Sequence, residues 1–459
     1  MGEVDTGPVD LRISGARVLP LLAADPTRVI ERGVVEVRGD RITHVGAAPS
    51  GSAATETLSA EGMLVTPAFV NTHCHTSQQL GRGLADDVDL PTWLHDRIWP
   101  YEAALSEADA EISTLACCLE QIRNGVTLLA DPGGQHVDGM ARSVAASGIR
   151  ALVGRSSMDA GAGLPAQMVE STAEVLDHQD DLAARWHGAA DGRIRMSYTL
   201  RTIFNCSDAL ILGSIEHAAR IDAVVQMHVA EVVEENAHCR ATRGDSTVRW
   251  LATLGVLGPR LLAVHVVHAD DAELDLLAAT ATPVSHNAAS NLRVLAAFPR
   301  IAEMLERGIT VGIGTDGAPS NNRMSILDEM WLASLVQKAR RGDPTALPAA
   351  AVVAMATRDG ARALGWEGEL GTLEVGSAAD LVLIDPAAPN LVPLSDPAAA
   401  LVSSLKSDNI HSVLCAGRWV LRDRAVTTVD EGAVLAEAEG RAAALRARIG
   451  LGRAVSSKG

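Results

Sequence analysis

Three histidines and one aspartate have the spacing expected of metal ligands. His73 and His75 lie two residues apart in an apolar run, PAFVNTHCH, that we expect to be a strand. The period of two in a strand aims both side chains at one face, and two buried imidazoles are costly unless their nitrogens have partners. His228 in MHVAE and Asp316 in GIGTD each end a later apolar run. Together the four predict a site for one divalent ion, with zinc favoured and iron(II) or cobalt also compatible.

Two further residues have the right chemistry and placement to move protons. Glu231 follows His228 by three residues, and His265 ends the run LLAVH. An acid at Glu231 also suits the first turn of a following helix. If a metal ion lowers the pKa of its water toward about 7, Asp316 takes the proton of that water and Glu231 protonates the ring nitrogen beside the attacked carbon. His265 hydrogen-bonds to the water or to the oxyanion. The predicted chemistry is hydrolytic loss of an amino group from a small nitrogen heterocycle.

Eight apolar runs of strand length would position these residues. Helical stretches such as SEADAEISTLACCLEQIRNG separate most of the runs, and strand followed by helix, repeated, predicts parallel βα units. Eight units predict a closed barrel, which places its chemistry at the carboxyl ends of the strands. Helix capping explains a polar residue there such as Asp131, but not the histidines, because His is a poor cap. The runs cover residues 66–75, 125–131, 149–155, 193–200, 223–231, 260–268, 282–287 and 310–316.

The two ends of the chain have a different pattern. Apolar and polar residues alternate between turn signals in residues 9–66, and again in HSVLCAGRWVLRDRAV near the other end. This pattern predicts short strands and hairpins. Residues 431–450 have the period of an exposed amphipathic helix, and we expect the tail VSSKG to be frayed.

The composition excludes several classes of partner. The chain has 459 residues and a formal net charge of −18, whereas nucleic acids and anionic membranes require a basic patch. The sequence has no apolar stretch of membrane-spanning length, no secretory leader and no CxxC pair among its six cysteines. We therefore expect a reduced, cytoplasmic protein that acts on a small molecule.

Several other catalytic designs are excluded by missing residues. Only three lysines occur, Lys338, Lys406 and Lys458, and the fourth run RIRMSYTL holds none. Barrel hydrolases with two metal ions often bridge them with a carboxylated lysine on that strand, so a single ion is favoured. The sequence lacks the P-C-x-x-C of the other zinc deaminases, and it lacks a G-x-S-x-G elbow or a P-loop.

Five segments in order resemble the motifs of the amidohydrolase superfamily. They are PAFVNTHCH, HVAE, the His of AVHVVH, SHNAASNLRVL and GIGTDGAPSNN. The branch they resemble contains guanine deaminases, adenosylhomocysteine deaminases and triazine chlorohydrolases, and the resemblance spans nearly the whole chain. It implies one divalent ion on His73, His75, His228 and Asp316, catalytic roles for Glu231, His265 and Asp316, and a homo-oligomer, commonly a dimer.

The same resemblance implies a distorted (β/α)8 barrel with a small β-sandwich formed from both chain ends. The expected divisions are 1–66 and 368–430 for the sandwich, 67–367 for the barrel and 431–459 for a helix and tail. The chain departs from the family pattern at Ala288, where relatives usually have Pro, and in LRVLAAF, which lacks the usual Ser-Gly. Both departures lie near the expected substrate pocket, so they weaken any transfer of substrate from relatives.

Three residues are candidates for substrate binding. Gln78 and Arg201 match positions where the resemblance to guanine deaminases implies a Gln and an Arg that contact the ring, and Trp93 would close over a flat ring. An Arg with a Gln suits a ring that carries a carbonyl, which favours a guanine-like oxopurine or a pterin. The simpler interpretations are a polar helix start for Gln78, an ion pair with a neighbouring acid for Arg201 and core packing for Trp93.

Alternatives remain on the same scaffold. A triazine-type enzyme would expel chloride or an alkylamine, and an adenosine or S-adenosylhomocysteine deaminase would release ammonia from a nucleoside. The chain lacks the GPHSPY segment typical of adenosylhomocysteine-type pockets. A barrel that has lost catalysis usually loses metal ligands, and all four are present here. His268 and His286 are expected to be loop residues outside the site.

Overall fold

Parallel strands form the wall of a barrel, as the eight runs predict. The computed structural model describes residues 7–89, 92–161, 163–165 and 168–450. Two of the eight staves are interrupted, and each consists of two short strands. The staves are β6 (Phe69–Asn71), β7 (Val126–Ala130), β8 (Arg150–Val153) with β9 (Ser156–Ser157), β10 (Ile194–Met196) with β11 (Tyr198–Leu200), β12 (Val225–Val229), β13 (Leu261–His265), β14 (Val284–His286) and β15 (Val311–Ile313).

The barrel closes between its first and last staves. Neighbouring staves pair in parallel from β6 to β15. Past the end of β6, the amide of Thr72 donates to the carbonyl of Ile313 at 2.8 Å, which joins β6 to β15. The interruptions and short strands make the barrel distorted, and the prediction of a distorted (β/α)8 barrel is confirmed.

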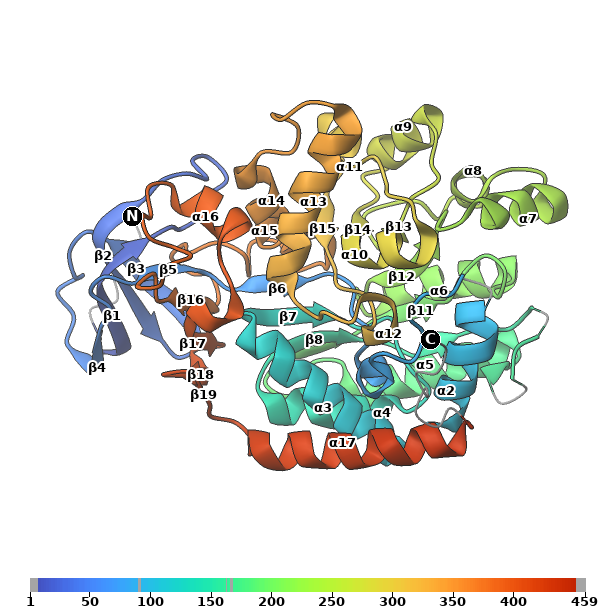
Figure 1. The fold of residues 1–459 in the computed structure, drawn as a ribbon, viewed down its shortest axis with the longest axis horizontal. Coiled ribbons are helices and arrows are strands. Elements are labelled where there is room, and N and C mark those ends of the chain that lie inside the picture. The colour runs from blue at the N-terminus through green and yellow to red at the C-terminus, as the bar shows by residue number, and fades with distance from the viewer. Residues whose placement is uncertain (1–6, 90–91, 162, 166–167, 451–459) are drawn as a thin grey trace, which may run out of the picture.

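Helices cover the outside of the barrel (Figure 1). Several begin with the expected cap, since Ser106, Ser171 and Asp270 each form a capping box with an acid three residues later. The longer ones are α3 (Glu107–Arg123), α4 (Val137–Ser147), α5 (Thr172–Trp186), α6 (Asp208–Arg220), α7 (Val233–Arg243), α9 (Asp271–Ala279) and α13 (Ile326–Arg341). The shorter ones are α2 (Trp99–Ala104), α8 (Thr247–Thr253), α10 (Ala288–Ser290), α11 (Ile301–Glu306), α12 (Ala318–Asn321), α14 (Ala349–Met355) and α15 (Arg358–Ala363). Among the described residues, further turns of 3-10 or π helix are η1 (Thr76–Gly81), η2 (Trp93–Ile98), η4 (Asn291–Leu295) and η5 (Ser407–Asn409).

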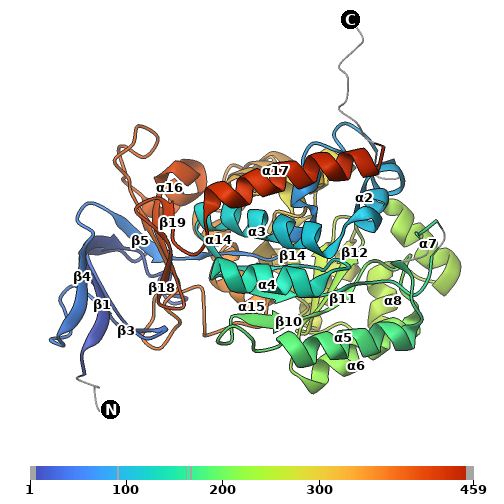
Figure 2. The ribbon, with the colours of Figure 1, turned by 90° about the horizontal axis from the view of Figure 1, so that it is seen from below.

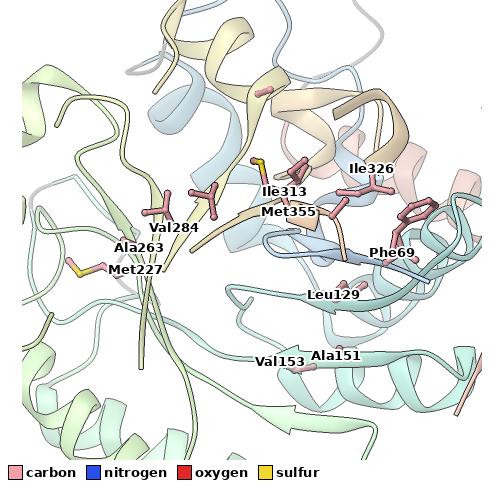
Figure 3. Close-up of a cluster of buried hydrophobic side chains, with 14 of the residues drawn as sticks. Phe69, Leu129, Ala151, Val153, Met227, Ala263, Val284, Ile313, Ile326 and Met355 are labelled. Carbon is pink, nitrogen blue, oxygen red and sulfur yellow. The ribbon is translucent and has the colours of Figure 1, made fainter. Parts of the chain in front are cut away.

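Strand residues alternate between two hydrophobic clusters. Leu129 packs with helix residues such as Ile326 and Met355, outside the strands (Figure 3). Its neighbour Leu128 belongs to a second cluster that includes Trp366. The strand period of two explains the division, because successive side chains point to opposite faces.

Both chain ends meet in a second sheet beside the barrel. In the described part of the chain this sheet has nine strands in the order β19-β18-β17-β16-β5-β1-β2-β3, with β4 paired to β1. The N-terminal and C-terminal strands lie together on one side of the barrel in both views (Figures 1 and 2). Its strands are β1 (Val9–Val18), β2 (Ile30–Arg38), β3 (Arg41–Gly46), β4 (Ala54–Ser59), β5 (Leu64–Pro67), β16 (Leu381–Ile384), β17 (Ile410–Cys415), β18 (Arg418–Arg422) and β19 (Ala425–Val426). A sandwich built from both ends is thus confirmed.

The sandwich and the barrel are joined by a buried ion pair. Arg150 on β8 donates through Nε and Nη2 to the two carboxylate oxygens of Asp380, each at 3.1 Å. Both side chains are buried, and the amide of Ala416 also donates to Asp380 at 2.8 Å. Such a pair is costly to break, because either partner alone would be a buried charge.

The last helix, α17 (Glu431–Arg448), is amphipathic, as the sequence predicted, but it is not exposed on all sides. One face is covered, since Val434, Ala438 and Leu445 pack in a cluster with Tyr101 and other residues around α3. Figure 2 shows α17 lying across α3 and α2. The predicted frayed tail falls in residues 451–459, which lie outside the described residues. A short helix, α16 (Pro397–Ser403), precedes β17. Among the described helices, none has both the length and the apolar content needed to cross a bilayer.

Candidate metal centre and substrate cavity

The four predicted ligands converge at one end of the barrel. Asp316 Oδ1 lies 3.4 Å from His73 Nε2 and 3.4 Å from His75 Nε2. His228 Nε2 lies 3.4 Å from His75 Nε2. All four residues are buried. Two ligand atoms each about 2.1 Å from a common tetrahedral ion stand about 3.4 Å apart, so the spacing suits zinc.

The unpaired atoms of this cluster also fit a metal ion. His73 has no hydrogen-bond partner on either ring nitrogen, and burial lowers its pKa, so its imidazole is neutral and able to ligate. The ring of His228 is fixed, because its Nδ1 lies 2.8 Å from the carbonyl of Arg201 and leaves Nε2 facing the cluster. Asp316 is held in the same way, because Ser290 and Ser320 both donate to its Oδ2 and leave Oδ1 facing the histidines.

Asp316 is kept ionised by its neighbours. Burial alone would raise its pKa, but the rings of His73 and His75, whose Nε2 atoms each lie 3.4 Å from Oδ1, hold the pKa well below its usual range. Its backbone has φ 62°, in the left-handed region that non-glycine residues rarely adopt. Conformations of this kind persist where the surrounding structure holds them, often at functional sites.

His73 and His75 do not lie on a strand, contrary to the prediction from the sequence. Strand β6 ends at Asn71, so both histidines follow the strand and His75 immediately precedes η1. Their positions are set by backbone bonds to neighbouring staves. The carbonyl of His73 accepts from the amide of Asp316 at 2.9 Å, and the amide of Cys74 donates to the carbonyl of Ala130 at 2.8 Å.

Glu231 and His265 lie beside the cluster. His265 Nε2 is 3.6 Å from Glu231 Oε1, and the His265 ring lies 5.6 Å from the ring of His73, centroid to centroid. Strict alternation would aim His265 outward with Leu261 and Ala263, but its φ of 74° departs from strand geometry and turns the ring inward.

The protonation of this pair is set mainly by burial. Burial and the charge of Asp316 raise the pKa of Glu231 to about 7, whereas burial lowers the pKa of His265 to about 4. A neutral imidazole therefore stands next to a carboxyl group that titrates near neutral pH. Two groups with pKa values pushed apart in this way are typical of acid–base catalysis.

The backbone at Glu231 is held by Glu235, a residue that the sequence analysis missed. The buried carboxylate of Glu235 accepts the amides of Ala230 at 2.8 Å and of Glu231 at 2.9 Å. Glu235 follows Glu231 by one helical turn in HVAEVVEE, which is the only sequence signal for this contact.

A cavity of about 690 Å³ opens over the cluster. Its floor includes His75, His228, Glu231, His265 and Asp316. Its walls are largely apolar and aromatic, and they include Trp93, Leu94, Trp99, Phe204, Val233 and Val294. A mostly apolar cavity of this size, with a few convergent polar groups, is the usual form of a small-molecule site.

The predicted substrate residues are arranged differently from the expectation. Trp93 and Arg201 line the cavity, but Gln78 is not among the described residues that do. Arg201 Nη1 lies 3.3 Å from Glu102 Oε1, and Gln78 Nε2 donates to the same oxygen at 2.7 Å. Arg201 thus has the ion pair that was its simpler interpretation. Glu102 is a buried acid that the sequence analysis missed.

Two histidines that were expected to be loop residues outside the site differ from that expectation. His286 is not in a loop but ends strand β14, where it is buried with neither ring nitrogen hydrogen-bonded. His268 follows β13 and lines the cavity.

The motif SHNAASN contributes three residues that hold the proposed catalytic groups. Ser290 donates to Asp316, as described above, and the side-chain amides of Asn287 and Asn291 lie 3.2 and 2.9 Å from His265 Nδ1. The departure at Ala288 lies in this segment, and Ala288 is buried there.

Comparison with known proteins agrees with this geometry. Residues 64–420 match the model of the amidohydrolase family. A 5-methylthioadenosine/S-adenosylhomocysteine deaminase from Pelotomaculum thermopropionicum is 36% identical over 436 residues, covering 94% of this chain and 98% of that protein. A 5'-deoxyadenosine deaminase from Methanothermobacter thermautotrophicus is 37% identical over 416 residues, covering 91% and 95%.

Solved structures give the same result. An adenosine deaminase from Xanthomonas campestris with bound zinc superposes with a TM-score of 0.90 at 30% identity, covering 96% of this chain and 99% of that one. The zinc complex of an atrazine chlorohydrolase from Arthrobacter aurescens gives a TM-score of 0.88 at 25% identity, covering 94% and 100%. The chain therefore belongs to the amidohydrolase family, and the prediction of a hydrolytic deaminase is confirmed.

Proposed function

We propose that the chain is a zinc-dependent deaminase of adenosine-type nucleosides, which converts the 6-amino group of the purine to a carbonyl. The observation that carries the proposal is the convergence of three imidazoles and one carboxylate at 3.4 Å spacings below a cavity, with Glu231 and His265 beside them. Zinc is proposed because the ligand set suits it and because two similar solved structures contain it.

The choice of an adenosine-type substrate replaces the oxopurine or pterin favoured above. The two similar relatives are named as deaminases of 5'-substituted or 5'-deoxy adenosines, which supports the alternative of an adenosine-type substrate. The contacts of Arg201 and Gln78 also favour an adenosine-type substrate over a ring that carries a carbonyl. Arg201 and Gln78, the pair expected to read a ring carbonyl, are both engaged by Glu102. We propose that Gln78 supports Glu102 rather than contacting substrate. The cavity has room for a sugar beside the base.

In this proposal His73, His75, His228 and Asp316 hold the ion. When bound, zinc would supply a Lewis acid that lowers the pKa of water toward about 7. Asp316 Oδ1 accepts a proton from the attacking water, since serines fix its other oxygen. Asp316 later gives this proton to the departing amine.

The remaining residues act on the purine and on the new oxygen. Glu231 donates its proton to ring nitrogen N1, so that negative charge does not build up on the ring as C6 is attacked. When ammonia leaves, the hydroxyl on C6 becomes the carbonyl and gives its proton to Glu231, which restores the acid. His265 Nε2 donates a hydrogen bond to the oxygen added at C6. Trp93 and Trp99 exclude water from the flat faces of the base.

The test is a panel of substrates offered to zinc-loaded enzyme, with ammonia release measured by a coupled assay. The panel contains adenosine, 5'-deoxyadenosine, 5'-methylthioadenosine, S-adenosylhomocysteine, guanine, pterin and atrazine, with chloride measured for the last. We expect kcat/KM for at least one adenosine-type nucleoside to exceed that for guanine and pterin by more than about 100-fold. Such a difference corresponds to about 2.7 kcal/mol in the transition state. A preference for guanine, pterin or atrazine would overturn the choice of substrate but not the family.

A further inference from the structure

Glu329 is a buried acid that the mechanism does not use. It lies in the first turn of α13, and only 1% of the residue is exposed. Its carboxyl group has partners in two short helices, α12 and α10. Oε1 accepts from Asn321 Nδ2 at 2.8 Å, and Oε2 accepts from the amide of Ala289 at 3.1 Å.

The first partner, Asn321, also contacts the backbone next to Asp316. Asn321 Nδ2 carries two hydrogens, and it donates both, one to Glu329 and one to the carbonyl of Thr315 at 2.7 Å. Thr315 directly precedes Asp316, whose backbone has φ 62°. A hydrogen bond to that carbonyl restrains the peptide that enters this strained position.

The second partner, Ala289, is followed by two residues that contact the side chains of Asp316 and His265. Ala289 lies in the SHNAASN segment, one residue before Ser290, which donates to Asp316 Oδ2. Asn291 follows, and its side-chain amide lies 2.9 Å from His265 Nδ1. Holding the amide of Ala289 therefore fixes the turn from which both contacts are made.

We propose that Glu329 is a positioning residue whose carboxyl group ties α10 to α12 and so positions Asp316 and His265 at the substrate cavity. The inference rests on the roles proposed above for Asp316 and His265. Both partners are donors, so both oxygens of Glu329 act as acceptors. A glutamine offers one acceptor oxygen, and its NH₂ group would face the other donor. The lost bond is buried, so water does not replace it freely.

The test compares Glu329→Gln with wild type on the best substrate of the panel. We expect kcat to fall about 10- to 100-fold with KM changed less than about threefold, because the binding walls are untouched. We also expect zinc affinity, measured by competition with a chelator, to fall about tenfold. Zinc affinity requires no substrate, so it tests Glu329 even if the proposed substrate is wrong.

Asp328→Asn is the matched control. Asp328 is the preceding residue on the same helix, its side chain is 41% exposed, and it pairs with Arg323 away from the cavity. We expect kcat, KM and zinc affinity to stay within about twofold of wild type.

A double-mutant cycle with Ser290→Ala separates positioning from general structural damage. If Glu329 acts through the turn that carries Ser290, the double variant loses at most about threefold more kcat than the worse single variant. If Glu329→Gln does not fold, Asn321→Ser replaces it, since this change removes one partner of Glu329 and leaves its carboxyl group in place. Unchanged kcat and zinc affinity, or losses in kcat that simply multiply in the double variant, would overturn the proposal.

Discussion

Glu231 gives the most detailed prediction, because its environment sets both the size and the pH dependence of its effect. Burial and the nearby charge of Asp316 raise its pKa to about 7. The proposed role needs the protonated acid, and a raised pKa means that this form is lost as the pH rises through about 7. At pH 8 about one tenth of the enzyme would carry the proton, and at pH 9 about one hundredth. We therefore expect kcat/KM to fall about tenfold per pH unit above 7.

The variant Glu231→Gln removes this proton donor and keeps the shape of the side chain. General acid catalysis contributes about 10²- to 10⁴-fold, so the variant should lose about 2.7–5.4 kcal/mol of transition-state stabilisation. Its residual activity should no longer fall tenfold per unit between pH 7 and 9. The assay is kcat/KM for ammonia release from pH 6 to 9, with Glu216→Gln on the outer surface of α6 as control. A wild-type profile that is flat or rises from pH 7 to 9 would refute the reasoning.

Two further predictions concern how the parts of the molecule are held together. Asp380→Ala should destabilise the fold by about 3–5 kcal/mol, because it leaves the buried Arg150 without its acceptor. Glu216→Ala, which breaks an exposed pair on α6, should cost less than about 1 kcal/mol. On α17, Leu445→Ala should cost about 2–5 kcal/mol because Leu445 is 1% exposed, whereas Leu435, 53% exposed, should tolerate alanine with little change. Urea unfolding followed by circular dichroism measures all four, and equal losses within either pair would contradict the packing described.

Much of the barrel could be predicted from the sequence because its signals are local. Each apolar run has strand length, and helical stretches separate most of the runs. The rules for connections between parallel strands leave few other arrangements. The cluster of His228 and Asp316 followed from one rule, that barrel strands present chemistry at their carboxyl ends. The interruptions between β8 and β9 and between β10 and β11 do not follow from run length, although Gly154 with Arg155, and Ser197, stand at them.

The parts that sequence reasoning missed depend on contacts between distant residues. Nothing near Arg201 indicates that Glu102, 99 positions earlier, would pair with it. The inward turn of His265 depends on a backbone angle that alternation does not predict. The covered face of α17 needs a partner surface on α3, so its apolar stripe alone could not show whether it would be buried.

The substrate could not be predicted from motifs because specificity lies in the cavity wall. Gln78 matched a motif position, but in the folded chain its amide is bonded to Glu102. The wall residues that do line the cavity, such as Phe204 and Val294, come from segments far apart in the sequence.

The claim on which the rest depends is that one ion is held jointly by His73, His75, His228 and Asp316. Crystals of the zinc-loaded enzyme, measured on either side of the zinc absorption edge, test it directly. The account predicts one anomalous peak per chain, within about 2.0–2.3 Å of the three imidazole nitrogens and the carboxylate. A peak that touches fewer than three of these residues, or no peak at all in crystals soaked with zinc, would contradict it.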